Sequence, residues 1–155
     1  MLGPTALPLA LAGAMLAASA AAETPEPYVP GLGDFMTAYV QPHHVKLWLS
    51  GSARNWPLAR YEADELSETF EDVVSYQGKW HDLPVASLVK DNIDPALAEL
   101  GKAIDAKDEV AFRAAYLKLN GACNACHQAA DHGFIVIQSP IANAYPDQNF
   151  LTPSR

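Results

Sequence analysis

The sequence has few of the residues that mark several common classes of protein. Only two of its 155 residues are cysteine, so a small domain held together by several disulfides is excluded. Lysine and arginine number 10 against 18 aspartate and glutamate residues, which gives a formal net charge of −8. A surface of that sign repels nucleic acid and anionic lipid, and we therefore expect no nucleic-acid partner. Half of the residues are hydrophobic, which is enough for one packed domain and too many for a disordered chain.

The first 22 residues lack any charged side chain. The run from Ala6 to Ala22 is mostly alanine and leucine, and it ends in small residues that fit the A-x-A rule for signal-peptidase cleavage. No lysine or arginine precedes this run, and an uncleaved membrane anchor is the alternative; the short length and Pro8 argue against a membrane span. We predict that residues 1–22 are a cleaved signal peptide. Residues 23–155 are then one exported domain without a membrane span, in the periplasm of a Gram-negative bacterium.

Hydrophobic periodicity predicts four helices, over residues 34–50, 56–76, 94–106 and 109–131, with a short helical turn near 84–89. The expected N-caps and stops of these helices are Asp34, Asn55, Asp94 and Asp108, and Gly51 and Gly133. Prolines exclude a long helix after residue 133. The predicted fold class is all-α: an antiparallel, up-down-up-down four-helix bundle. Residues 134–155 form an extended C-terminal arm packed on that bundle.

Two helices carry patterns that predict which side chains face inward. In the helix at 109–131, apolar residues recur at intervals of four and three, which is typical of a bundle seam. They are Phe112, Tyr116, Leu119, Cys123 and Cys126. In the helix at 56–76, acidic residues that include Glu62 are expected to form the solvent face.

The two cysteines belong to one motif, Cys123-Asn124-Ala125-Cys126-His127, which is the C-x-x-C-H attachment signature of c-type haem. On a helix the two cysteines and the histidine lie at positions i, i+3 and i+4, so they share one face. Two thiols on that face can form thioethers with the two vinyl groups of one porphyrin. The imidazole of His127 then lies under the iron as its proximal ligand.

Other uses of a C-x-x-C pair fit this sequence less well. A redox dithiol of the thioredoxin type belongs to a βαβ pattern, and no such alternation is present. A closed zinc site needs four ligands, and there is no second cysteine pair. The adjacent His127 and the predicted export signal both favour one covalent haem c as the cofactor.

With this motif on its last helix, the chain resembles the class II c-type cytochromes, which include cytochrome c-prime. The resemblance covers roughly residues 32–132. The chain is also similar to small exported bacterial c-type cytochromes through the stretch from His44 to Trp48, Asn55-Trp56, and the segment from Gly133 to Val136. It departs from cytochrome c-prime in having Asn124-Ala125 between its cysteines and in its C-terminal arm. The resemblance makes a homodimer a candidate assembly.

The sixth iron ligand has to come from outside the motif's own helix turn. No methionine follows His127, and the one methionine between the predicted signal and the motif is Met36. The resemblance implies that the first helix forms the distal haem wall, and this helix holds Met36, His43 and His44. Adjacent helical residues diverge by about 100°, so the two histidines cannot both face inward. We favour His44 as distal iron ligand, with His43 and Met36 as alternatives; His81 and His132 are weaker candidates, and we expect His132 to point away from the haem.

Three functions are compatible with these residues. The first is a one-electron carrier, a monohaem cytochrome whose acidic surface docks on a basic patch of an exported redox partner. The second, implied by the likeness to cytochrome c-prime, is a five-coordinate haem protein that binds nitric oxide or carbon monoxide. The third is a peroxidase, for which His43 or His44 would need help from Arg54 or Arg60. We favour the electron carrier, which is not an enzyme.

Overall fold

The computed structural model of this protein describes residue 3 and residues 27–152. The signal peptide predicted for residues 1–22 lies outside the described residues, apart from Gly3, and so do the last three residues of the predicted arm. No helix in the described part of the chain is both long and apolar enough to cross a membrane.

The described residues form an all-α structure, as the sequence predicts. Among them, β-pairing is restricted to one isolated bridge between Trp80 and Leu83. The helical segments, of which η1 and η2 are π-helical, are α1 (Leu32–Asp34), η1 (Phe35–Val40), α2 (Gln41–Ser52), α3 (Trp56–Gln77), α4 (Val85–Leu88), η2 (Val89–Ile93), α5 (Asp94–Asp105) and α6 (Glu109–Ala129). The described residues make four helical rods. The first is the continuous run of α1, η1 and α2, the second is α3, the third is the continuous run of α4, η2 and α5, and the fourth is α6.

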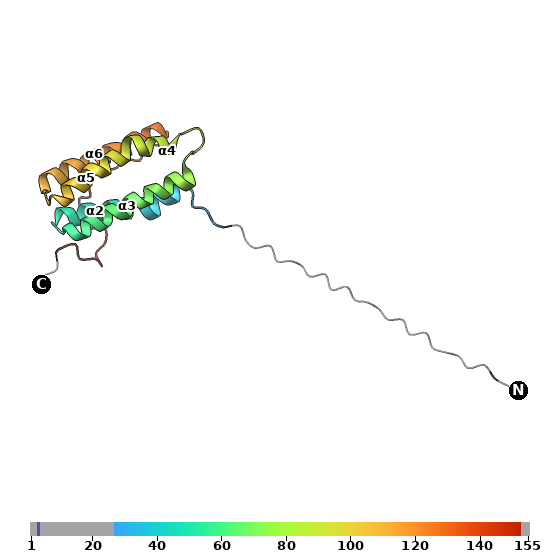
Figure 1. Ribbon diagram of the computed structural model, residues 1–155, viewed down its shortest axis with the longest axis horizontal. Helices are drawn as coiled ribbons and strands as arrows, with labels where there is room; N and C mark the ends of the chain where they lie inside the picture. The colour runs from blue at the N-terminus through green and yellow to red at the C-terminus, as the bar shows by residue number, and fades with distance from the viewer. Residues whose placement is uncertain (1–2, 4–26, 153–155) are drawn as a thin grey trace.

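The rods lie in two layers, with α2 beside α3 and α5 beside α6 (Figure 1). The short connections after α2 and after α5 lie at one end of the molecule, and the loop between α3 and α4 lies at the other. The segment η1 and the C-terminal part of α6 share this second end (Figure 1). Buried apolar side chains from all four rods meet in one continuous core.

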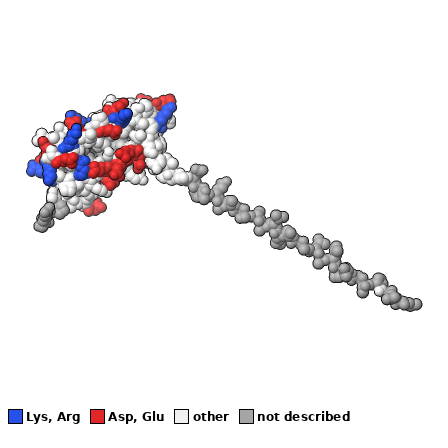
Figure 2. All heavy atoms as spheres, in the orientation of Figure 1, with Lys and Arg blue, Asp and Glu red and all other residues white. Residues whose placement is uncertain are grey.

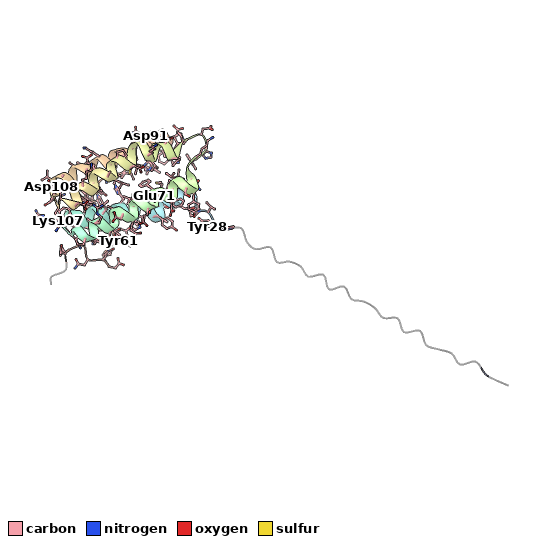
Figure 3. The ribbon with its side chains drawn as sticks, in the orientation of Figure 1. Tyr28, Tyr61, Glu71, Asp91, Lys107 and Asp108 are labelled. Carbon is pink, nitrogen blue, oxygen red and sulfur yellow. The ribbon has the colours of Figure 1, made fainter. Side chains whose placement is uncertain are left out.

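Two of the predicted helix starts are confirmed by their capping hydrogen bonds. The Asn55 side chain accepts from the backbone N–H of Leu58 at 3.4 Å, and the Asp108 carboxylate accepts from two backbone N–H groups of the first turn of α6 at 2.9 and 3.0 Å. Asp108 is labelled in Figure 3 at the end of the molecule away from Tyr28. Asp34 is not a cap: the first rod starts at Leu32, and the Asp34 carboxylate accepts from the Gly31 N–H at 2.9 Å and from the Tyr28 hydroxyl at 3.0 Å.

Helix α5 begins at Asp94, as the sequence predicts, but Asp94 is not an N-cap. Ile93 before it is helical, and the rod continues back through η2 and α4 to Val85. Both π-helical segments end two residues before a proline, η1 before Pro42 and η2 before Pro95. A proline inside a helix has no N–H to donate, and its ring crowds the carbonyl four residues back. The wider π turn relieves that crowding, so each proline changes the local winding and the rod continues through it.

Gly51 is not a helix stop but a contact between rods. It is buried inside α2, which runs on to Ser52, and a Cβ added to it would overlap the Phe112 ring of α6. Its lack of a side chain therefore lets the first and fourth rods approach. At the end of α6, Gly133 is likewise not the stop, since that helix ends at Ala129.

Beyond α6, residues 130–152 contain no helix and no strand. This segment returns to the connection between α2 and α3, where the Asn55 side chain donates to the Leu151 carbonyl at 3.2 Å (Figure 1). Phe150 is buried there, and the ammonium of Lys46 lies 5.0 Å from the centre of the Tyr145 ring. The arm is therefore attached along the helices by specific contacts.

Replacing Gly51 by alanine is expected to destabilise the protein by about 1–3 kcal/mol, because the added methyl group overpacks the contact with Phe112. Gly121 provides the matched control, because it lies inside α6 with nothing within 4 Å of an added Cβ. There, Gly121→Ala should stabilise by about 0.5–1 kcal/mol through helix propensity alone. Urea unfolding of both variants checks this, and equal effects of one sign would contradict the packing role of Gly51.

Candidate functional site

A cavity of about 300 Å³ opens among the rods at the end that holds η1 and the C-terminal part of α6. This volume is at the lower end of the range usual for small-molecule and cofactor sites. Its walls are mostly apolar and come from all four rods, the loop before α4 and the arm; among the lining residues are Phe70, Val73, Val85, Val89 and Ile93. Of the potential iron ligands named from the sequence, Met36, His44, His127 and His132 line it, together with both cysteines.

The two thiols of the motif face this cavity from α6. Cys123 is buried at the end of the predicted apolar seam, and Cys126 is half-buried one turn later. Burial, with a smaller effect of the neighbouring Cys126, raises the pKa of the Cys123 thiol to about 12, and burial also raises the pKa of Cys126. Reactive redox dithiols have the opposite property, a lowered pKa that keeps one sulfur ionised.

His127 lines the cavity with a defined tautomer. Its Nδ1 lies 2.9 Å from the backbone carbonyl oxygen of Ile135 in the arm. A carbonyl can only accept a hydrogen bond, so Nδ1 carries the hydrogen and the lone pair of the neutral ring is on Nε2. An imidazole whose other nitrogen donates to a carbonyl is the usual form of a metal-ligating histidine.

His44 faces inward, as its helical register predicts, but both its ring nitrogens have protein partners. Nε2 lies 2.8 Å from the amide oxygen of Asn120, and Nδ1 lies 2.9 Å from the hydroxyl of Tyr116. Because the amide oxygen accepts, Nε2 carries the hydrogen. The single hydroxyl hydrogen of Tyr116 is shared between Nδ1 at 2.9 Å and the backbone carbonyl oxygen of His44 at 2.8 Å. Burial lowers the pKa of His44 to about 4, and the hydrogen bond to Asn120 offsets this only in part.

The two alternative distal residues differ in position. Met36 is half-buried, belongs to the π-helical segment η1 and lines the cavity. His43 is not among the cavity residues; its Nδ1 lies 2.8 Å from a carboxylate oxygen of Glu62 in α3. Glu62 was expected on the solvent face, and that expectation is wrong. Its side chain is only 2% exposed and pairs with His43 of the neighbouring helix α2.

Three further residues considered from the sequence also have clear positions. Arg54 pairs with Glu109, and Arg60 pairs with Asp105, so neither guanidinium lines the cavity. His132 does line the cavity, contrary to expectation. Helix α6 ends before it, and the chain that follows returns along the cavity, where Ile135 and Ile137 are also lining residues. Helical spacing could not show this, since His132 lies three residues beyond the last helical turn.

The residues of the cavity fit a covalently held haem. Two thiols and an imidazole with a free Nε2 lie on one wall, apolar side chains form the others, and a thioether and a second imidazole are further lining groups. Among the described residues, no group of three or more histidine, cysteine, aspartate or glutamate side chains is arranged to hold a metal ion. Comparison of the chain with family models, curated proteins and solved structures finds no match.

The low pKa of His44 predicts a specific loss of stability in acid. In the unfolded chain this ring takes up a proton near pH 6.5, whereas in the folded protein it stays neutral down to about pH 4. Below pH 6.5 the unfolded state therefore binds more protons, and stability falls as the pH is lowered from 6.5 to 4, by up to about 3 kcal/mol. Replacement by glutamine should remove this part of the pH dependence.

Urea unfolding between pH 4 and 7 checks this, with His81→Gln as the control, because His81 is exposed in the loop after α3. The control should keep the acid sensitivity of the unmodified protein. If His44→Gln keeps it as well, His44 is not the buried neutral group described above.

Proposed function

We propose that this protein is an exported monohaem c-type cytochrome that carries one electron. The chain would form an antiparallel, up-down-up-down four-helix bundle around one haem. Cys123 and Cys126 would hold the haem as thioethers, and Nε2 of His127 would be the proximal iron ligand. When bound, the haem supplies one-electron oxidation and reduction at its iron.

The observation that carries the proposal is that both cysteines and the histidine of the motif line one apolar cavity. Cys123, Cys126 and His127 all line it, on the face of α6 that packs the core from Phe112 to Leu119. A protein with no ligand for this space would be expected to fill it, since protein interiors are close-packed. The raised pKa of both thiols disfavours a redox-exchange role for this pair.

The chain's own residues have separate tasks in this proposal. The apolar walls keep water from the iron, which protects the two oxidation states from side reactions. The hydrogen bond to Ile135 keeps the proton of His127 on Nδ1, so Nε2 stays available to the iron. His44, Tyr116 and Asn120 form a buried polar network beside the cavity.

For the distal ligand, the contacts favour Met36 over His44. His44 bonds to Asn120, which lies seven residues before His127 and therefore about 10 Å from it along α6. Figure 1 shows the first rod running in the direction opposite to α6. Met36 is eight residues before His44, so along the rods it would lie at about the level of His127. Met36 also has a free thioether, whereas each nitrogen of His44 has a partner. Ligation by His127 and Met36 would raise the reduction potential relative to two histidines.

The charge of the surface supports a basic redox partner. Figure 2 shows acidic side chains gathered over α3 on the visible face. Glu71 and Asp72 are exposed there, directly next to the cavity residues Phe70 and Val73. Attraction between this acidic segment and a basic patch would speed association and weaken with salt.

Optical and electron paramagnetic resonance spectra of the purified holoprotein test the ligation. The unmodified ferric protein should be low-spin, and Met36→Leu should convert it to high-spin because leucine has no donor atom. His44→Gln is the matched control and should remain low-spin.

The other outcomes are equally informative. A high-spin spectrum of the unmodified protein would contradict a sixth protein ligand and favour the five-coordinate gas-binding alternative. A high-spin spectrum of His44→Gln alone would identify His44 as the ligand, and a purified protein without haem would overturn the proposal as a whole.

A further inference from the structure

The C-terminal arm is held to α6 at the haem motif itself. The amide nitrogen of Asn124 donates to the Ile137 carbonyl at 2.9 Å, and its amide oxygen accepts from the Ile137 N–H at 2.7 Å. A side-chain amide thus pairs with both backbone groups of one arm residue, as a neighbouring strand would. Asn124 lies between the two cysteines, so this clamp is part of the attachment motif.

The same face of α6 holds two more arm residues in sequence. The Asn120 amide nitrogen donates to the Ser139 hydroxyl at 3.3 Å, and His127 Nδ1 donates to the Ile135 carbonyl at 2.9 Å. Residues 120, 124 and 127 are one helix turn apart, and arm residues 139, 137 and 135 alternate along an extended chain. The arm therefore runs antiparallel to α6 and is fastened at every second residue.

The alternation gives the arm an inner and an outer side. Ile135, which is 43% exposed, and Ile137 line the cavity. Val136 between them and Phe134 before them are 70% and 79% exposed. The Ile135 carbonyl, which accepts from His127, lies two residues before Ile137, where Asn124 holds the arm. On its other side Ile135 is held by its own N–H, which donates to the His132 carbonyl at 2.8 Å. The segment that carries the acceptor of His127 is therefore fixed at both ends, at His132 and at Ile137.

We propose that Asn124 and the arm form a positioning device for the proximal ligand: the clamp at Ile137 fixes the Ile135 carbonyl, and that carbonyl fixes the His127 imidazole. This inference rests on the proposed function, because it assigns a task to residues around the haem. A hydrogen bond from Nδ1 increases the basicity of Nε2 and sets the ring orientation. A more basic ligand stabilises ferric iron over ferrous iron, so the arm lowers the reduction potential of the haem.

The test compares Asn124→Ala with Asn143→Ala in the holoprotein. Asn143 is the matched control, because its side chain also accepts a backbone N–H within the arm, that of Tyr145 at 2.7 Å, but has no contact with α6 in the described hydrogen bonds. Asn124→Ala should shift the reduction potential to a more positive value. It should also speed solvent exchange of the His127 Nδ1 proton, followed by NMR of the reduced protein, about tenfold or more, the factor that corresponds to the loss of a net hydrogen bond. Asn143→Ala should change neither quantity.

If the Asn124 variant fails to fold, proton exchange in the unmodified protein provides a second measurement. In the reduced holoprotein, the His127 Nδ1 proton and the Ile137 amide proton should both exchange slowly. The first is donated to the Ile135 carbonyl and the second to Asn124 in the clamp. Rapid exchange of the Nδ1 proton would overturn the positioning role, as would an Asn124→Ala holoprotein with unchanged potential and exchange. Failure of the proposed function is seen separately, as a lack of covalent haem in the unmodified protein, and that result would overturn both.

Discussion

One face of α6 has to pack the core along most of its length and yet leave a space at its C-terminal end. From Phe112 through Tyr116 and Leu119 this face is fully buried against the other rods. From Cys123 to His127 the same face borders the cavity instead. At the N-terminal end of α6, the close approach of α2 and Phe112 depends on Gly51. At the C-terminal end of α6, the cavity is bordered by the π-helical segments η1 and η2. The C-x-x-C-H motif therefore continues the core seam into a region that protein side chains do not fill.

Two prolines lie just after the π-helical segments that supply residues to the cavity. Pro42 and Pro95 lie inside long rods, and each follows a π-helical segment that lacks the usual hydrogen-bond spacing. Both π segments contribute residues to the cavity, Met36 from η1 and Val89 and Ile93 from η2. π-Helical turns are frequent at functional sites because the extra residue changes which side chains face inward. The two prolines thus shape the cavity wall without lining it.

Sequence patterns identified the features that depend on local chemistry. The all-α class, the caps Asn55 and Asp108 and the inward direction of His44 follow from residue type and helical period. Other features depend on neighbours distant in sequence. Nothing near Gly51 indicates that Phe112 lies against it, and nothing near Glu62 indicates that His43 would allow its burial. The arm has no periodicity, so its pairing with Asn124 and His127 could be seen only in three dimensions. Of the site, helical spacing predicted that Cys123, Cys126 and His127 share one face, whereas the presence of Met36 in the same cavity depends on the packing of the rods.

The central claim is that the two cysteines hold one haem covalently, and the intact mass of the denatured protein tests it most directly. The protein should be produced by export in cells that attach haem c, unfolded in acid, and weighed beside a Cys123→Ser, Cys126→Ser double variant. The account predicts that the unmodified chain keeps the added mass of one haem after unfolding and has no thiol that reacts with an alkylating reagent. The double variant should have the mass of the chain alone. An unmodified chain without the added haem mass and with two reactive thiols would contradict the account.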